Sequence, residues 1–218
     1  MPFPISELGK IFKKKKLRKK IDPEKVASSQ GKVFGIGLSR TGTTSLAEAL
    51  RILGYETVDW NYNGKIIGWP EFYAFDAATD TPCSMQFETL YHSFDNSKFI
   101  YTKRNKSDWS VSIKKHFETE EPSGVLESMR GDRWKSNEDW GWENTLQRIR
   151  IHSCLYAKYS TWIEAYDAHD KRVRSFFENK PPKRFSEINI PSGEGWRELC
   201  NFLDRPVPNQ SFPHENKS

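Results

Sequence analysis

A short loop of small residues carries the most informative chemistry in this sequence. It runs Gly37-Leu38-Ser39-Arg40-Thr41-Gly42-Thr43-Thr44, with its glycines spaced G-x-x-x-x-G. Glycines let backbone N–H groups turn toward an anion, and the N-terminus of a following helix adds partial positive charge. The hydroxyls of Thr43 and Thr44 and the guanidinium of Arg40 lie in the same stretch. We therefore predict a phosphate cradle, although a tight turn without a ligand would use the same glycines.

The loop differs from that of an NTP-hydrolysing enzyme at one position. Such P-loops carry lysine directly after the second glycine, where it reaches the β- and γ-phosphates. Thr43 occupies this position, and the cation of the loop is Arg40. A kinase or NTPase would also need an apolar strand that ends in an aspartate for magnesium. No well-formed strand of this kind is visible, although Phe75-Asp76 keeps a kinase or NTPase as an alternative.

A second candidate anion site follows about 60 residues later. The apolar run Phe99-Ile100-Tyr101-Thr102 is predicted to be a strand that leads into Arg104, and Ser112 stands eight residues beyond this arginine. A guanidinium presents a planar fork of donors that suits a phosphate. Ser112 is predicted to project from the next helix toward the same anion.

Together the two motifs resemble those of the sulfotransferase family. Residues 39–46 are similar to its 5′-phosphosulfate loop, and Arg104 with Ser112 to its 3′-phosphate motif, where Asn105 and Asp108 also suit the pattern. The segments Gly193–Cys200 and Phe212–Asn216 resemble the C-terminal part of one bacterial branch. The resemblance implies 3′-phosphoadenosine 5′-phosphosulfate (PAPS) as donor, 3′,5′-adenosine bisphosphate (PAP) as product and no metal. The implied donor-binding residues are Ser39, Arg40, Thr41, Gly42, Thr43, Thr44, Ser45, Arg104 and Ser112.

The sequence departs from the family pattern in two places. Cytosolic members often have an aromatic residue after Gly-Thr-Thr that helps to hold adenine, whereas this chain has Ser45. The late Arg-Lys-Gly motif is not visible either, and the candidates to replace it are Lys183, Arg184 and Arg197. What holds the adenine is therefore open.

Sulfuryl transfer needs a charge stabiliser and a general base. Arg40 is the predicted stabiliser. Asp80 is the first candidate base, because the branch that this chain resembles carries Asp-x-Pro there, and Asp76 is the second. A plain turn or N-cap carboxylate before Pro82 would also explain Asp80. His116 is interpreted as a surface or structural residue.

The elements around these motifs predict an α/β fold. Residues 32–38, 55–60 and 98–102 are predicted strands. A helix is expected over 46–53, another from Ser107 or Asp108, a mostly helical stretch over 144–177 and a late helix over 196–203. This order predicts three α/β/α layers around a central parallel sheet, P-loop NTPase-like, with a helical insertion. The polar segment 118–143, with Trp134, Trp140 and Trp142, is predicted to be a loop that caps the acceptor site.

Charge separates a tail from the rest of the chain. The net charge is +5, yet residues 1–20 contain eight basic residues and one acidic residue, so the remaining chain is near neutral. We expect a basic tail over 1–22 and one sulfotransferase-like domain over 23–218. The tail is either a solvated, partly helical arm or a segment that contacts an anionic membrane surface. No specific nucleic-acid partner, secretory signal or transmembrane segment is expected. Three widely spaced cysteines favour a reducing cytoplasm.

The sequence thus favours a PAPS-dependent sulfotransferase that acts on a hydroxyl or amine of a small molecule or glycan. A P-loop kinase or NTPase that acts on a small molecule is the alternative. A non-catalytic module that retains the fold is a further one. The acceptor and the oligomeric state stay open.

Overall fold

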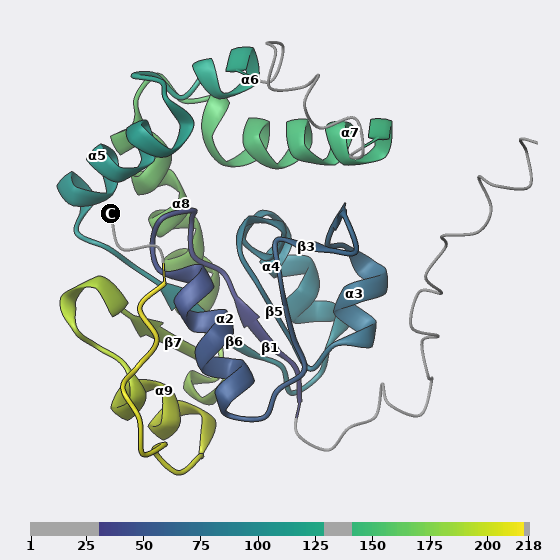
Figure 1. Ribbon diagram of the computed structural model, residues 1–218, viewed down its shortest axis with the longest axis vertical. Coiled ribbons are helices and arrows are strands. Elements are labelled where there is room, and N and C mark those ends of the chain that lie inside the picture. The colour runs from purple at the N-terminus through teal and green to yellow at the C-terminus, as the bar shows by residue number, and fades with distance from the viewer. Residues whose placement is uncertain (1–30, 129–140, 216–218) are drawn as a thin grey trace, which may run out of the picture.

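A seven-stranded sheet organises the molecule (Figure 1), and its order is β4-β3-β2-β5-β1-β6-β7. This computed structural model describes residues 31–128 and 141–215, so the predicted tail 1–22 lies outside the described residues, as do Trp134 and Trp140 of the predicted cap. The five parallel strands are β1 (Val33–Gly35), β2 (Thr57–Asp59), β5 (Ala77–Thr79), β6 (Lys98–Thr102) and β7 (Phe185–Ile188). Two short strands, β3 (Asn61–Tyr62) and β4 (Lys65–Ile66), add an antiparallel edge.

Helices cover both faces of the sheet, because successive strand residues point to opposite sides. Val33 packs in a cluster with Leu46 of α2 (Thr43–Ile52) and Leu199 of α9 (Trp196–Leu203). Its neighbour Phe34 packs on the other face with Phe87 in a cluster formed by α3 (Trp69–Ala74), α4 (Thr81–Ser93) and α8 (Trp162–Phe177). The predicted three-layer α/β/α fold with a central parallel sheet is confirmed.

A third, largely aromatic core lies among the remaining helices. It includes Trp109 of α5 (Lys106–Phe117), Tyr156 of the π-helical turn η4 (Ser153–Ala157) and Trp162. The helices α6 (Gly124–Ser128) and α7 (Gly141–His152) belong to this part, which forms one end of the molecule in Figure 1. This is the predicted helical insertion, and because α6 and the start of α7 fall within the segment 118–143, that segment is not a loop along its whole length.

Several elements differ from the sequence predictions. The central strand β5 is only Ala-Ala-Thr, too short and too small to show an apolar pattern, and the strands and helices β7, α3 and α4 were likewise not expected. The helix α5 begins earlier than predicted, because Asn105 is its N-cap and accepts hydrogen bonds from the backbone N–H groups of Ser107 and Asp108. The short 3₁₀ helices η5 (Pro182–Arg184) and η6 (Ile190–Ser192) flank β7.

The parallel arrangement places the carboxyl ends of five strands at one edge of the sheet. The loop after β1, Asp59 at the end of β2, Asp80 after β5, Arg104 after β6 and η6 after β7 all lie at this edge. Ligands of open α/β sheets bind in the crevice outside these ends. None of the helices in the described ranges is long and apolar enough to cross a membrane.

Candidate active site

The loop between β1 and α2 is held from below by buried hydroxyl groups. Thr41 Oγ1 donates to the carbonyl of Leu38 at 2.7 Å and lies 2.7 Å from Thr102 Oγ1. Ser84 Oγ donates to the carbonyl of Gly37 at 2.6 Å. A Cβ on Gly37 would lie 1.9 Å from Thr102 Oγ1 and 2.7 Å from the Thr102 carbonyl, so only glycine fits there. The loop is thus a rigid platform before any ligand binds.

Two aromatic side chains of the helical insertion fix the next residue. The hydroxyl of Tyr156 accepts a hydrogen bond from the backbone N–H of Ser39 at 3.0 Å, and the indole of Trp109 donates to its carbonyl at 2.8 Å. Arg40 and Gly42 then take positive φ angles of 69° and 101°, which turn the chain into the first turn of α2. The first N–H groups of a helix have no intrahelical acceptor, so this end of α2 offers donors to an anion.

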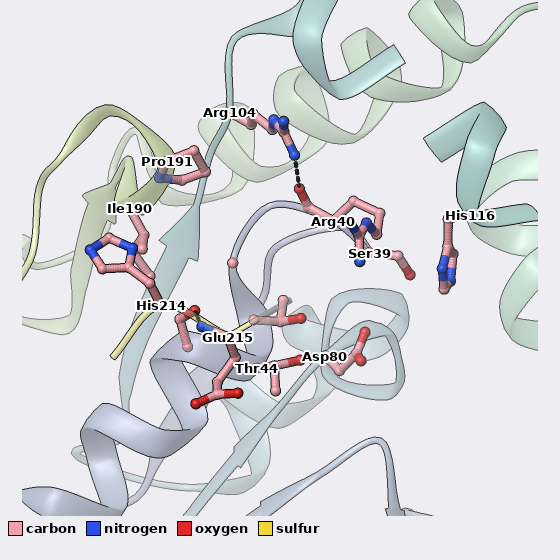
Figure 2. A pocket seen from close by; sticks show the side chains of 13 residues that line it. Ser39, Arg40, Thr44, Asp80, Arg104, His116, Ile190, Pro191, His214 and Glu215 are labelled. Atoms are coloured by element: carbon pink, nitrogen blue, oxygen red, sulfur yellow. Dashed lines mark hydrogen bonds between the residues drawn. The ribbon is translucent and has the colours of Figure 1, made fainter. Parts of the chain in front are cut away.

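The two predicted anion motifs meet at Arg40. Its Nε donates to Ser112 Oγ on α5 at 3.1 Å, and its carbonyl accepts from Nη1 of Arg104 at 3.4 Å (Figure 2). The backbone of Arg104 is itself held by Tyr166, whose hydroxyl donates to the Arg104 carbonyl at 2.8 Å. Segments more than 60 residues apart in sequence therefore form one cationic surface.

A cavity of about 480 Å³ opens over this surface, a volume typical of small-molecule sites. In Figure 2, Ile190, Pro191 and His214 gather at one end and Asp80 and His116 at the other. Glu215 enters from the C-terminal segment, and its backbone N–H donates to Ser45 Oγ at 3.0 Å. The predicted donor residues that line the cavity are Ser39, Arg40, Gly42, Thr43, Thr44, Ser45 and Arg104.

Two carboxylates stand beside the loop at the ends of adjacent strands. Asp80 has a positive φ of 78° and accepts a hydrogen bond from the backbone N–H of Thr81 at 2.6 Å, which also caps α4. Burial and the charge of Asp59 raise the pKa of Asp80 to about 7. Burial also raises the pKa of Asp59, although hydrogen bonds from Thr79 and Thr44 oppose the rise. A carboxylate with a pKa near 7 is suited to accept a proton at neutral pH.

The position of Asp80 also bears on two sequence arguments. Because β2 ends in Asp59 and Asp80 directly follows β5, the argument against a kinase from a missing aspartate at a strand end does not hold; the absent lysine after Gly42 remains. Asp76 lies before β5, at the opposite end of the strand from Asp80. Its Oδ2 accepts from the backbone N–H of Glu56 at 2.9 Å, and it lines neither this cavity nor the one beside it.

Sequence reasoning missed several residues that line the cavity. His116, interpreted as a surface residue, is exposed but lines the cavity wall near Asp80. Partial burial and the charges of Arg40 and Arg148 lower the pKa of His116. Ile190 and Pro191 carried no recognisable signal, because single residues without a fixed spacing to a motif indicate nothing in a sequence. His214 lies in the segment Phe212–Asn216, whose resemblance to one bacterial branch gave it no role.

Other predicted residues lie elsewhere. Thr41 and Ser112 do not line the cavity: the Thr41 hydroxyl faces the protein interior, and Ser112 contacts Arg40 from behind. Of the three candidates for a late cation, Arg184 packs on Tyr91 and bonds to Ser97, and Arg197 pairs with Glu198 at the surface. Neither these two nor Lys183 lines the cavity.

Known proteins are similar to this chain along most of its length. A family model described as a sulfotransferase domain matches residues 32–65 and 69–218. The chain belongs to the sulfotransferase domain family. It is 30% identical over 213 residues to the Ava biosynthesis cluster protein M of Aspergillus versicolor, a match that covers 84% of this chain and 80% of that protein. A solved structure of mouse sulfotransferase SULT7A1 complexed with PAP is 16% identical, with a TM-score of 0.40, over 87% of this chain and 66% of that one.

The family assignment makes this sulfotransferase an enzyme of group transfer. The described residues contain no group of three or more histidine, cysteine, aspartate or glutamate side chains that is arranged to hold a metal ion. The cavity is lined by two guanidinium groups, two carboxylates and two imidazoles, beside the N-terminus of α2.

Proposed function

We propose that this sulfotransferase moves the sulfuryl group of PAPS to a hydroxyl or amine of a small-molecule or glycan acceptor. One observation carries the proposal: Arg40, Arg104 and the N-terminus of α2 face the same cavity, and Asp80 lines that cavity at one end. The donor has two anionic groups, and the cationic surface of the cavity has two guanidinium groups and a helix N-terminus to receive them. Asp80, the candidate proton acceptor, then lies at the end of the cavity where the sulfuryl acceptor would approach.

Each part of the donor has matching residues. The 5′-phosphosulfate would take the N–H groups at the start of α2, the hydroxyls of Thr43 and Thr44, and Arg40. The 3′-phosphate would take Arg104, and Ser112 would act indirectly, as the acceptor that holds Arg40 in place. The end of the cavity formed by Ile190, Pro191 and His214 would hold the adenine, in place of the aromatic residue that Ser45 replaces.

The proposed reaction divides the work between two side chains. The donor supplies a sulfuryl group on a bridging phosphate oxygen: a bond forms from the acceptor oxygen to sulfur, and the bond from sulfur to the bridging oxygen breaks. Arg40 would stabilise the charge that develops on the departing phosphate oxygen. Asp80 would remove the acceptor proton, which its raised pKa favours near neutral pH. Because a sulfuryl group carries less charge than a phosphoryl group, we expect transfer to survive EDTA.

A thermal shift measurement with PAP tests this proposal. A ligand at about 100 times its dissociation constant adds roughly 2.7 kcal/mol of stability. For a chain of this size, that is a rise in Tm on the order of 5–10 °C. We expect the rise with PAP and not with AMP. A rise only with ATP and magnesium would indicate a kinase, and no rise with any of the three would indicate a fold that has lost its donor site.

A further inference from the structure

A second cavity adjoins the first one and has a different character. It measures about 360 Å³ and shares Ser39, Thr44, Asp80 and His116 with the donor cavity. Its other lining residues are Asp59, Trp60, Asn61, Phe117, Arg148 and His152. The shared residues include Asp80, the candidate base. A molecule in the second cavity would therefore meet a donor in the first cavity at Asp80.

Four rings form a continuous wall along this second cavity. The ring centroids of His116 and Phe117 lie 4.7 Å apart, those of Phe117 and His152 5.1 Å apart, and those of His152 and Trp60 6.2 Å apart. The wall begins at the shared end, where His116 stands, and continues into the part that belongs to the second cavity alone. Rings at such spacings offer edges and faces to another flat ring.

His152 is the one member of this wall that is both polar and deeply buried. Its side chain is 3% exposed, and neither ring nitrogen has a hydrogen-bond partner among the described residues. His169 is equally buried, but its Nε2 lies 2.9 Å from the carbonyl oxygen of Ile36. A buried polar group without a partner destabilises the fold unless a ligand or water satisfies it.

The protonation state of His152 restricts what that partner is. Burial and the charges of Arg148 and His116 lower the pKa of His152 to about 3. At neutral pH its ring is therefore uncharged, with one nitrogen that donates and one that accepts. A neutral hydroxyl satisfies either nitrogen, whereas an anionic group would find no positive charge on this ring.

On the basis of the proposed function, we propose that the second cavity binds a hydroxylated aromatic acceptor. Its ring would lie along the aromatic wall, its reacting hydroxyl would face Asp80, and a second, remote hydroxyl would pair with His152. His152 is then the residue that selects acceptors with two hydroxyl groups on a flat ring system. Trp60 and Phe117 select for flatness.

Matched acceptors test the substrate class. With PAPS as donor, we would compare the kcat/KM values of four compounds: 2-naphthol, 1,6- and 2,7-dihydroxynaphthalene, and methyl β-glucoside. We expect turnover of the aromatic compounds, with the better diol preferred over 2-naphthol by about tenfold, the value of one well-made hydrogen bond. Turnover of the glucoside in preference to all three aromatics would overturn the proposal, and so would the absence of any preference for either diol over 2-naphthol.

Two variants of His152 test its role as the selecting residue. His152→Phe keeps an aromatic ring at this position and should remove the advantage of the diol over 2-naphthol, measured as the ratio of their kcat/KM values. His152→Gln retains a donor and an acceptor and should restore part of the preference. His92→Phe, at an exposed histidine on α4, is the matched control and should behave as the wild type. An equal loss for 2-naphthol and the diols in His152→Phe would show a structural role and overturn the assignment.

Direct binding separates this inference from the proposed function. The part of the tryptophan-fluorescence quenching by the diols that His152→Phe removes, measured without nucleotide, reports the second cavity, and the PAP thermal shift reports the first. If the diols bind in a His152-dependent way to a protein that fails to bind PAP, the assignment of the second cavity to the acceptor is supported and PAPS as the donor is refuted. PAP binding without diol binding would do the reverse.

Discussion

The two halves of the proposed site, one for the donor and one for the acceptor, are built in different ways. In the donor half, the residues proposed for the two anionic groups are local, because the loop, Thr43, Thr44 and Arg104 follow β1 or β6, which are neighbours in the sheet. Only its adenine end draws on later segments. The acceptor half draws on Trp60 after β2, His116 and Phe117 at the end of α5, and His152 at the end of α7. The difference teaches that residues for a widely used ligand such as a nucleotide lie at strand ends, whereas residues for one particular acceptor come from separate segments.

The same contrast applies to rigidity. Loop residues of the donor half have their polar atoms paired beneath the cavity, as Thr41 and Ser39 show. In the acceptor half, both ring nitrogens of His152 are without a hydrogen-bond partner among the described residues. We infer that the donor half is preorganised for one molecule and that the acceptor half is completed by its ligand. The following variants test whether the two halves can be separated.

The largest effect is expected for Arg40→Ala. It removes a charge aimed at the departing oxygen, so kcat should fall about 10³-fold. PAP affinity should fall less, because Arg104 and the N-terminus of α2 remain. Single-turnover kinetics and calorimetry measure the two quantities. Arg197→Ala, at a surface arginine paired with Glu198, is the control and should retain full turnover. Near-normal turnover in Arg40→Ala would refute the catalytic assignment.

Asp80→Asn should reduce kcat about 10²-fold, as expected for loss of a general base. In the wild type, kcat/KM should rise with pH through about 7, because Asp80 accepts a proton only when it is ionised. The variant should lack this dependence. Asp76→Asn, at the opposite end of β5, should leave the pH profile unchanged. If Asp76→Asn and not Asp80→Asn removes the pH dependence, the base has been misassigned.

Stability offers an independent measure of the same carboxylate. The pKa of Asp80 is higher in the folded protein than its ordinary value of 3.8, so its ionisation weakens the fold as pH rises from about 4 through about 7. Asp80→Asn should therefore have a higher Tm than the wild type at pH 8, and the difference should vanish near pH 4. Calorimetric scans at both pH values decide this; a lower Tm at pH 8 would contradict the pKa direction.

Arg104→Ala should weaken PAP binding by roughly 2 kcal/mol, the loss of one charge-assisted pair. It should also abolish the preference for PAP over AMP, with little change in the turnover of bound donor. Calorimetric titrations with PAP and AMP test both statements. Lys106→Ala removes a nearby surface ion pair with Asp167 and should leave the preference intact. A preserved preference in Arg104→Ala would mean that another residue reads the 3′-phosphate.

The smallest effect is expected in the acceptor half. Trp60→Ala shortens the aromatic wall, so the KM for a dihydroxynaphthalene should rise about tenfold. PAP affinity should not change, because Trp60 does not line the donor cavity. Trp69→Ala, at a tryptophan that stacks on Phe94 away from both cavities, is the control. Coupled losses of PAP and acceptor affinity in Trp60→Ala would show that the two halves are not separable.

The sequence alone was sufficient for the fold class and for the position of the loop between β1 and α2. The local geometry of this loop requires glycines at fixed spacing between an apolar strand and an amphipathic helix. Such a pattern can be recognised from the sequence alone. The same holds for Arg104, which directly follows an apolar strand. The strand β5 was missed because three small residues carry no periodicity, and they form a strand only between β1 and β2.

Tertiary structure decided the rest of the site. The sequence suggested both Asp80 and Asp76 as bases, and only the direction of β5 in the sheet shows that they lie at opposite ends of a strand. It offered no reason to join His116 with His152, because these residues meet through the packing of α5 against α7 and η4. Local conformational preference determines motifs, whereas the position of side chains from distant segments depends on which surfaces the chain buries together.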